Sequence, residues 1–368
     1  LTCGGIEEAA AAGQLLVRIP ATASTPPSTG AFTITQVLRS AVLERQQTSL
    51  EVLAKMPIVS GELRERLVGA SMGDWPRVTP TRAMGGSLSN AAGVPPPNES
   101  QAAAIAAALS EPLTLIQGPP GCGKTDVAAQ IIWNASRQGL GKILVNAPAN
   151  IACDNICNRL AGLALAVPPL RFRPYSALGS PSLDPRCSME THIGEVLTGA
   201  DLESWLFLVK VRNTAGVPIE SDDSEYRKLW MQGASLALNR AQVVICTCSS
   251  AGSKYLLPFA FSFCLIDEAA QATEPDVLVA VSRCVQQLVL IGDDRQLGPV
   301  VVCRAAANAG LQQSLFVRLA RRGHRIFWLN IQHRMHPAIA EFPCIQFYEG
   351  RLKNGVTAAD RSSTVQFC

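Results

Sequence analysis

The clearest chemistry in this sequence lies in the stretch from Gly118 to Thr125, which reads GPPGCGKT. It satisfies the P-loop pattern, in which glycines precede a lysine and a hydroxyl residue. Glycines let backbone amides point at phosphate oxygens, because no Cβ stands in the way. Lys124 adds a mobile charge for the β- and γ-phosphates, and the Thr125 hydroxyl can bind Mg²⁺. The pattern predicts a nucleoside triphosphate site, and the other residues expected to line it are Pro119, Pro120, Gly121, Cys122 and Gly123.

Polar side chains follow two further apolar runs. The run 261–266 leads directly into Asp267 and Glu268, and the run 288–291 is followed closely by Gln296. In a P-loop sheet, a carboxylate at the carboxyl end of a buried strand holds the metal, so we expect Asp267 to bind Mg²⁺. Glu268 would orient and deprotonate the attacking water, and Gln296 would hydrogen-bond the γ-phosphate or that water. A carboxylate pair after an apolar run is common in solvated turns. The ends of three strands, which carry the P-loop, Asp267 with Glu268, and Gln296, together indicate one hydrolytic site.

The elements that must position these residues follow an α/β rhythm. Short apolar runs alternate with longer helical patterns, which predicts a parallel sheet covered on both faces, as in RecA-like P-loop proteins. The expected strands are 113–116, 143–146, 243–246, 263–266, 288–291 and 326–329. The expected helices are 126–137, 150–164, 274–285 and 311–321.

Two regions depart from this rhythm. Residues 170–240 are too long for one crossover and contain a polar helical pattern over 224–240, so we expect an inserted helical subdomain. The first ninety residues carry strand-like pieces at 14–19 and 31–37 and helical pieces at 43–54 and 61–68, and a Gly/Pro/Ser-rich linker follows at 85–98. This part is expected to be the end of a small β-rich subdomain with linking helices.

Composition restricts the remaining possibilities. The net charge of +3 over 368 residues is too small to argue for nucleic acid by itself. Twelve cysteines without a CxxC pair favour reduced thiols and an intracellular protein over a disulfide framework or a zinc site. No apolar run reaches membrane-spanning length, so no membrane partner is expected. Because the chain opens on Leu1, we interpret it as a fragment of a longer protein.

Beyond the P-loop, several short motifs occur in the order typical of superfamily-1B helicases. They are NESQ (98–101), APAN (147–150), CTC (246–248), DEAAQ (267–271), GDDRQLGP (292–299) and QHRMHP (332–337). Together with FYEGRL (347–352) and NGVTAADR (354–361), they make the chain resemble the superfamily-1B RNA helicase of nonsense-mediated mRNA decay. The resemblance is specific over about 97–361, loose over 170–240 and faint before residue 90.

The resemblance implies a role for each matching residue. Gln101 would read the adenine edge and select ATP, and Arg334 would contact the γ-phosphate across a cleft. His333 stands where the family usually has a Tyr that stacks on the base. The residues implied to lie along the nucleic-acid backbone are Pro148, Asn150 and Thr247.

The resemblance also implies an organisation and an activity. Residues 97–329 would form the first RecA-like domain, with 170–240 inserted, and 330–368 would begin the second. The activity would be ATP-driven, Mg²⁺-dependent 5′→3′ translocation on single-stranded RNA or DNA, in the cytoplasm, together with mRNA-decay proteins. Two alternatives stay open: a nucleotide- and RNA-binding module without motor activity, and a related superfamily-1B DNA helicase.

Two further expectations concern single features. Cys122 lies among amides at a helix N-terminus and near Lys124, which favours a reactive thiolate. In the tail, 331–368, apolar side chains have no partner sheet, so we expect mobility unless the tail folds back on the first domain. The side chains concerned are Ile339, Phe342, Ile345, Phe347 and Tyr348.

Overall fold

The computed structural model describes residues 6–10, 14–17, 41–55, 61–68, 88–174, 180–215 and 224–361. The chain divides into two compact units, Leu1–Ser40 and Ala41–Cys368. In the first unit, β1 (Ile6–Ala10) and β2 (Gln14–Val17) pair as an antiparallel hairpin. β2 confirms the strand expected near residue 14, whereas the one expected at 31–37 lies outside the described residues.

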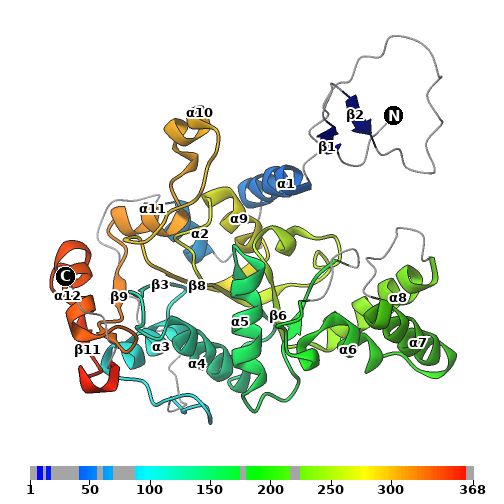
Figure 1. Cartoon of the computed structure of the whole chain (residues 1–368), viewed down its shortest axis with the longest axis horizontal. Helices are drawn as coiled ribbons and strands as arrows, with labels where there is room; N and C mark the ends of the chain where they lie inside the picture. Colours follow the sequence, from blue (N-terminus) through cyan, green and yellow to red (C-terminus); the bar gives the residue numbers. More distant parts are fainter. Residues whose placement is uncertain are drawn as a thin grey trace. The chain divides into compact units, whose positions relative to one another are not determined.

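The second unit is built on a seven-stranded sheet whose strands are all parallel, in the order β5-β6-β4-β7-β8-β3-β9 (Figure 1). The strands are β3 (Leu113–Gln117), β4 (Ile143–Ala147), β5 (Leu170–Arg171), β6 (Val243–Thr247), β7 (Phe261–Ile266), β8 (Cys284–Gly292) and β9 (Ile326–Trp328). All six strands expected in this part of the chain are confirmed. Strand β5 was not expected, because two residues are too few to show a periodic pattern.

Successive side chains along each strand point to opposite faces of the sheet, so the buried side chains form two cores. On β3, Leu115 belongs to one core and Ile116 to the other. The first core includes side chains of α2 (Gly61–Val68), α9 (Glu274–Val281) and α11 (Leu315–Arg321). The second includes those of α3 (Glu99–Ser110), α4 (Lys124–Arg137) and α5 (Asn150–Ala161). The fold is therefore an α/β sandwich of the RecA-like P-loop type, as the alternating pattern predicts.

Helix ends are where expectation and structure differ. Helix α9 ends at Val281 rather than 285, because strand β8 begins at Cys284. Helix α11 begins at Leu315 because the Ser314 hydroxyl accepts a hydrogen bond from the Val317 amide at 3.2 Å. The preceding short helical segments are α10 (Arg304–Ala306) and η3 (Ala307–Leu311). Helix α1 (Ala41–Lys55) and α2 confirm the two helical pieces expected before residue 90.

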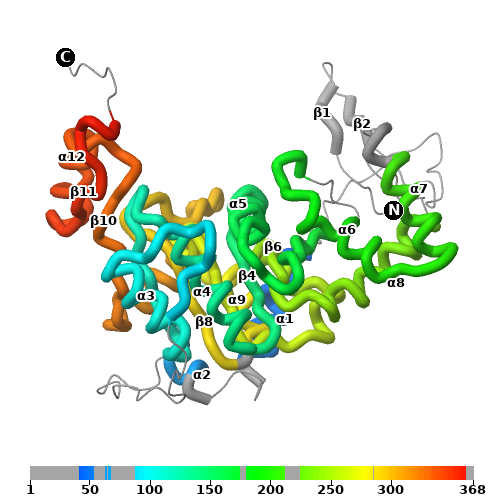
Figure 2. The backbone as a smooth tube through the Cα atoms, turned by 90° about the horizontal axis from the view of Figure 1, so that it is seen from below, coloured from blue at the N-terminus to red at the C-terminus, as the bar shows by residue number. Residues whose placement is uncertain are grey.

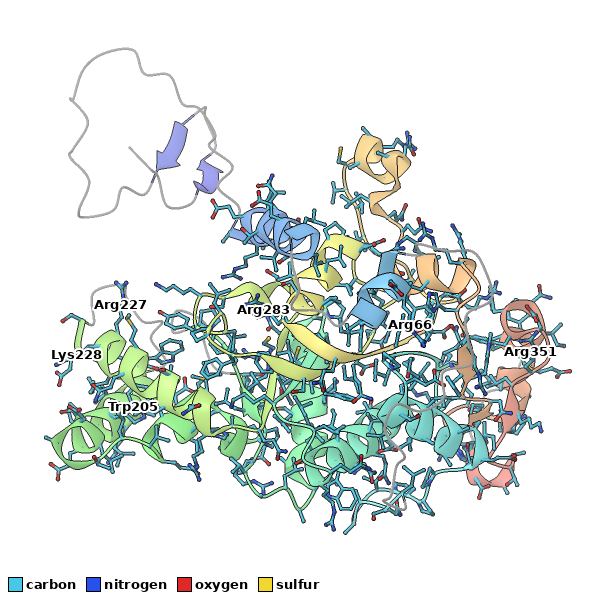
Figure 3. All side chains as sticks on the ribbon, turned by 180° about the vertical axis from the view of Figure 1, so that it is seen from behind. Arg66, Trp205, Arg227, Lys228, Arg283 and Arg351 are labelled. Atoms are coloured by element: carbon cyan, nitrogen blue, oxygen red, sulfur yellow. The ribbon has the colours of Figure 1, made fainter. Side chains whose placement is uncertain are left out.

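The inserted region is helical, as expected. It contains η1 (Pro185–Cys187), α6 (Met189–Gly194), α7 (Gly199–Ala215) and α8 (Ser224–Arg240). Trp205 on α7, labelled in Figure 3, is fully buried. Its ring stacks on that of Tyr226 on α8, which is also buried, with ring centroids 4.9 Å apart. These rings belong to the same core as side chains of the sheet, so the insertion packs on that face and has no separate core.

The described part of the tail, residues 331–361, packs only partly against the rest of the second unit. After β9 come β10 (Ile331–Gln332), α12 (Pro337–Tyr348), β11 (Lys353–Asn354) and η4 (Ala359–Arg361). Figures 1 and 2 place α12 and the α7–α8 pair at opposite ends of the sheet. Tyr348 is 3% exposed, so the alternative in which the tail folds back holds for this residue. The other four side chains stay exposed: Ile339, Phe342, Ile345 and Phe347.

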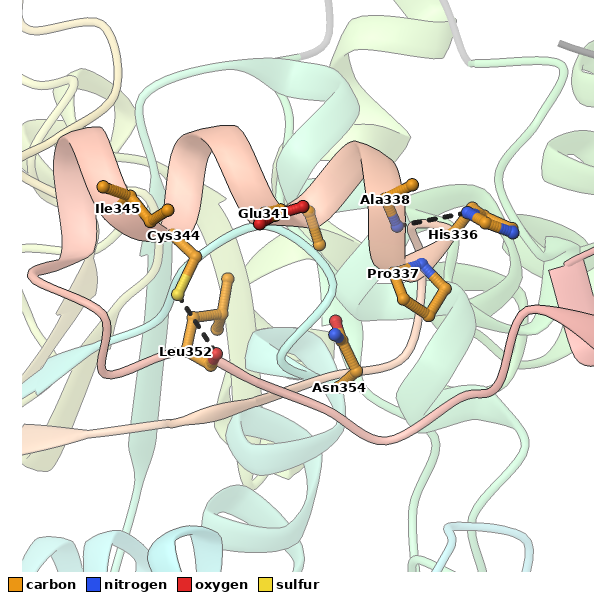
Figure 4. Close-up of a pocket in the computed structure, with 9 residues that line it drawn as sticks. His336, Pro337, Ala338, Glu341, Cys344, Ile345, Leu352 and Asn354 are labelled. Atoms are coloured by element: carbon orange, nitrogen blue, oxygen red, sulfur yellow. Dashed lines mark hydrogen bonds between the residues drawn. The ribbon is translucent and has the colours of Figure 1, made fainter. Parts of the chain in front are cut away.

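A pocket of about 510 Å³ opens between α12 and β11 (Figure 4). His336 caps the helix by accepting a hydrogen bond from the Ala338 amide, and the Cys344 thiol contacts the Leu352 carbonyl. Glu341 and Asn354 also line the pocket. None of the P-loop residues lines this pocket.

Candidate nucleotide site

The P-loop joins the end of β3 to the start of α4. Gly121 and Gly123 have φ of 79° and 77°, a conformation that favours glycine. A Cβ on Gly121 would lie 2.6 Å from the Arg334 Cβ, and one on Gly123 would lie 2.9 Å from the Gln101 Nε2. Both glycines are therefore required by backbone geometry and by the close approach of two residues that the sequence analysis singles out.

Lys124 links the loop to Glu268. Its ammonium donates to the Gly118 carbonyl at 2.8 Å and lies 3.8 Å from the Glu268 Oε1. Strands β3 and β7 are separated by β8, so these two residues meet only because the carboxyl ends of parallel strands share one edge of the sheet. A phosphate entering the loop would meet a cation that already lies beside Glu268.

Asp267 is a buried carboxylate at the end of β7, with 5% of its surface exposed. Burial, and then repulsion from Glu268, raise the pKa of Asp267 to about 6; the Glu268 amide, which donates to Asp267 Oδ1 at 2.9 Å, and Lys124 oppose this rise. A divalent cation would relieve the cost of that buried charge, and Asp267 with the Thr125 hydroxyl offers the hard oxygen donors that Mg²⁺ prefers. These residues fit the expected Mg²⁺ site.

Glu268 has a left-handed backbone, with φ of 52°. Such a conformation costs a non-glycine residue on the order of 1–2 kcal/mol. The Gln271 amide donates to Glu268 Oε2 at 2.9 Å and steadies the side chain that approaches Lys124. Backbone strain at this position is consistent with a residue that is held in place to act on substrate.

Gln296 is held on a buried carboxylate that the sequence analysis did not single out. Its amide donates to Asp293 Oδ2, while the Gln117 amide donates to Asp293 Oδ1 at 2.6 Å and to Asp294 Oδ1 at 2.8 Å. Gln117 and Asp293 are 0% and 1% exposed. The signal that could have identified Gln117 is a polar residue at the very end of the apolar run that precedes the P-loop.

Gln101 and the tail residues lie directly on the loop. Gln101 forms a capping box with Asn98 at the start of α3, and its Nε2 donates to the Cys122 carbonyl at 3.1 Å. The His333 amide donates to the Gly121 carbonyl at 2.9 Å, and the Arg334 amide donates to Gln332 Oε1 at 2.9 Å. The structure thus brings Gln101, His333 and Arg334 to the P-loop, as the family resemblance implies.

The expectation of a reactive thiolate at Cys122 is wrong. The side chain is fully buried, and burial raises its pKa to about 12 against the weaker opposite effect of Lys124. Cys122 lies with the core side chains on the α4 face of the sheet, out of contact with water. The nearby lysine is therefore not enough to turn this thiol into a thiolate.

The three residues expected to contact nucleic acid lie at the ends of neighbouring strands. Ala147 pairs with Thr247 in the β4–β6 register, and Pro148 and Asn150 follow β4 directly. The Asn150 Oδ1 accepts a hydrogen bond from Arg171 Nη2 at 2.8 Å, which fixes the orientation of this side chain at the start of α5. Their contact with nucleic acid remains a prediction.

Within the part of the chain that the structure describes, no helix has the length and apolar character needed to cross a membrane.

Two family models match most of the region from residue 96 onward. A family model described as an AAA domain matches residues 96–172 and 218–304, and a second one of the same description matches 311–367. The solved structure of the PRRSV helicase aligns with 69% of this chain and 38% of the helicase chain, at 16% sequence identity. Its TM-score of 0.36 is too low to support an inference.

Three relatives are similar along nearly the whole chain. Regulator of nonsense transcripts 1 from Caenorhabditis elegans is 40% identical over 342 residues, covering 90% of this chain and 30% of the relative. Its homolog from Arabidopsis thaliana is 36% identical, with coverages of 90% and 26%, and the ATP-dependent helicase NAM7 from Saccharomyces cerevisiae is 37% identical, with 92% and 34%. The chain spans between about a quarter and a third of these relatives. It belongs to the regulator of nonsense transcripts 1 family.

Proposed function

We propose that this chain is the ATP-hydrolysing part of a helicase that translocates 5′→3′ on single-stranded RNA during nonsense-mediated mRNA decay. Residues 97–329 are its first RecA-like domain and 330–368 begin the second. The observation that carries the proposal is the meeting of Lys124 with Glu268 at one sheet edge, with Arg334 against Gly121. Family membership supports the biological setting, and a cytoplasmic location with decay-protein partners is part of the proposal.

The residues divide the hydrolytic step among them. Glu268 takes a proton from water as its oxygen attacks the γ-phosphorus and the bond to the β–γ bridging oxygen breaks, which yields ADP and phosphate. Lys124 and Arg334 stabilise the charge that develops on the phosphoryl oxygens. Mg²⁺, when bound, neutralises phosphate charge, and Thr125 and Asp267 are the residues that would hold it. Gln101 is proposed to select adenine, and His333 to pack on the base.

Nucleotide binding by the chain itself tests the proposal. Lys124→Ala is expected to lose affinity for Mg-ATP, whereas Glu268→Gln is expected to bind it normally and hydrolyse it far more slowly. Lys228→Ala, an exposed residue on α8, is the matched control and should behave like the wild type. Equal affinities in wild type and Lys124→Ala, measured by isothermal titration, would contradict the assignment of the P-loop.

A second candidate function is nucleotide and RNA binding without motor activity. The exposure of α12 favours it, because Phe342 is 66% and Ile345 61% exposed. Translocation requires a second domain that packs firmly and moves relative to the first. The rate of ATP hydrolysis with and without single-stranded RNA separates the two candidates. Stimulation by RNA supports the motor, and RNA binding without stimulation supports the binding module; a preference for DNA would support the DNA helicase alternative.

A further inference from the structure

Asp293 is a buried carboxylate that connects three parts of the molecule. It follows β8 and is 1% exposed. Its Oδ1 accepts hydrogen bonds from the Gln117 amide at 2.6 Å and from the Arg295 backbone amide at 3.1 Å. Its Oδ2 accepts from the Gln296 amide and from the Tyr348 hydroxyl, the latter at 2.8 Å. The P-loop strand, the loop after β8 and the tail helix therefore meet on one carboxylate.

Tyr348 reaches this carboxylate from the last residue of α12. The helix ends there because Glu349 adopts a left-handed backbone, with φ of 55°, and the Gly350 amide closes the end by donating to the Cys344 carbonyl. Tyr348 is 3% exposed, and burial together with Asp293 raises its pKa, so the hydroxyl stays protonated and acts as a donor. Arg351 lies 5.3 Å above the Trp328 ring of β9 and holds the following turn on the sheet (Figure 3).

The two side chains that donate to Asp293 Oδ2 differ in how readily they can break this hydrogen bond. Gln296 lies in an exposed loop and is the residue proposed to reach the γ-phosphate, whereas Tyr348 is buried. A buried carboxylate oxygen that loses its last donor bears a large desolvation penalty. When Tyr348 is in place, Gln296 leaves Oδ2 with one donor still bound. Without the hydroxyl, departure of Gln296 would strip Oδ2 of both side-chain donors.

We propose that Tyr348 is a positioning residue that frees Gln296 to engage the γ-phosphate, which couples docking of α12 to the nucleotide state. The inference rests on the proposed function of this same site. By thermodynamic linkage, a bound triphosphate stabilises the docked tail helix by the same factor by which the docked helix raises triphosphate affinity. A diphosphate, which has no γ-phosphate for Gln296, leaves the helix unaffected.

The surface ion pairs beside Tyr348 do not carry this coupling. Arg295 lies 3.6 Å from Asp294 and 3.8 Å from Glu349, and these side chains are 44%, 29% and 57% exposed. Exposed ion pairs contribute little free energy because water and salt screen them. The tyrosine hydroxyl on the buried oxygen is therefore the group to remove.

The test compares the affinities of two nucleotides, so that each variant carries its own control. Dissociation constants for Mg-ADP and for the non-hydrolysable Mg-AMPPNP are measured on the full chain as wild type, Tyr348→Phe, Gln296→Ala and the double variant. Tyr348→Phe removes only the hydroxyl and keeps the buried ring. Ile345→Ala, an exposed residue on the same helix, is the matched control.

The preference for AMPPNP over ADP is expected to fall roughly tenfold in each single variant and no further in the double variant, because both act through one hydrogen-bonded oxygen. A general loss of structure would weaken both nucleotides alike and leave the preference unchanged. An unchanged preference in Tyr348→Phe, or effects of the single variants that multiply, overturns the coupling alone. Failure of the wild-type chain to bind either nucleotide overturns the proposed function, and the coupling with it.

Discussion

Asp267 offers the most direct test of the electrostatics of the site. Its pKa is raised from 3.8 to about 6 by burial first and by Glu268 second. The folded chain therefore holds a proton that the unfolded chain has released between about pH 4 and pH 6, so stability falls as the pH rises through this window. At about 1.4 kcal/mol per pKa unit, the ionised carboxylate destabilises the metal-free fold by roughly 3 kcal/mol above pH 6.

The perturbation is Asp267→Asn, which keeps the shape and the acceptor for the Glu268 amide but removes the charge. Free energies of unfolding are measured by urea denaturation with EDTA between pH 4 and pH 8. At pH 4 the variant and the wild type should be nearly equally stable, and at pH 7.5 the variant should be more stable by up to about 3 kcal/mol. Glu203→Gln, an exposed carboxylate on α7, should show no such pH-dependent difference.

Mg²⁺ provides the second half of the test. Adding it at pH 7.5 should stabilise the wild type and not Asp267→Asn, because only the wild type has the charge that the cation relieves. A stability difference between variant and wild type that stays constant from pH 4 to pH 8 would refute the reasoning, since it would mean that Asp267 is not desolvated in the folded chain.

Three further outcomes are expected. Glu268→Gly should raise the free energy of unfolding by about 1 kcal/mol, because glycine adopts φ of 52° without strain, and it should abolish ATP hydrolysis. A lower stability of this variant in thermal denaturation would argue against backbone strain at this position. Brief alkylation with iodoacetamide should label exposed Cys303 and spare Cys122 with or without nucleotide, and a labelled Cys122 in peptide mapping would contradict its burial. Asn150→Ala should weaken binding of single-stranded RNA roughly fivefold in a filter-binding assay and leave ATP affinity unchanged, whereas exposed Ile151→Ala should change neither; equal RNA affinity in both variants would remove Asn150 from the interface.

The sequence by itself determined the parts of this protein that depend on local pattern. Runs of apolar residues placed the six longer strands, and the 3.6-residue period placed α5 and α8. The P-loop could be predicted because Gly118 to Thr125 form their cradle from consecutive residues. Asp267, Glu268 and Gln296 could be placed at one edge because the carboxyl ends of parallel strands coincide whatever the strand order is.

The tertiary structure alone decided whatever depends on contacts between distant residues. Cys122 looks activated in the sequence, yet the α4 face of the sheet buries it, and desolvation outweighs the nearby lysine. Gln117, Asp293 and Tyr348 lie up to 231 positions apart, and no local pattern links them. The tail pattern shows apolar residues in a helix, but only the packing decides that Tyr348 is buried while Phe342 is exposed. Burial and charge pairing are properties of the folded neighbourhood, so they follow from the assembled layers and not from the order of residues along the chain.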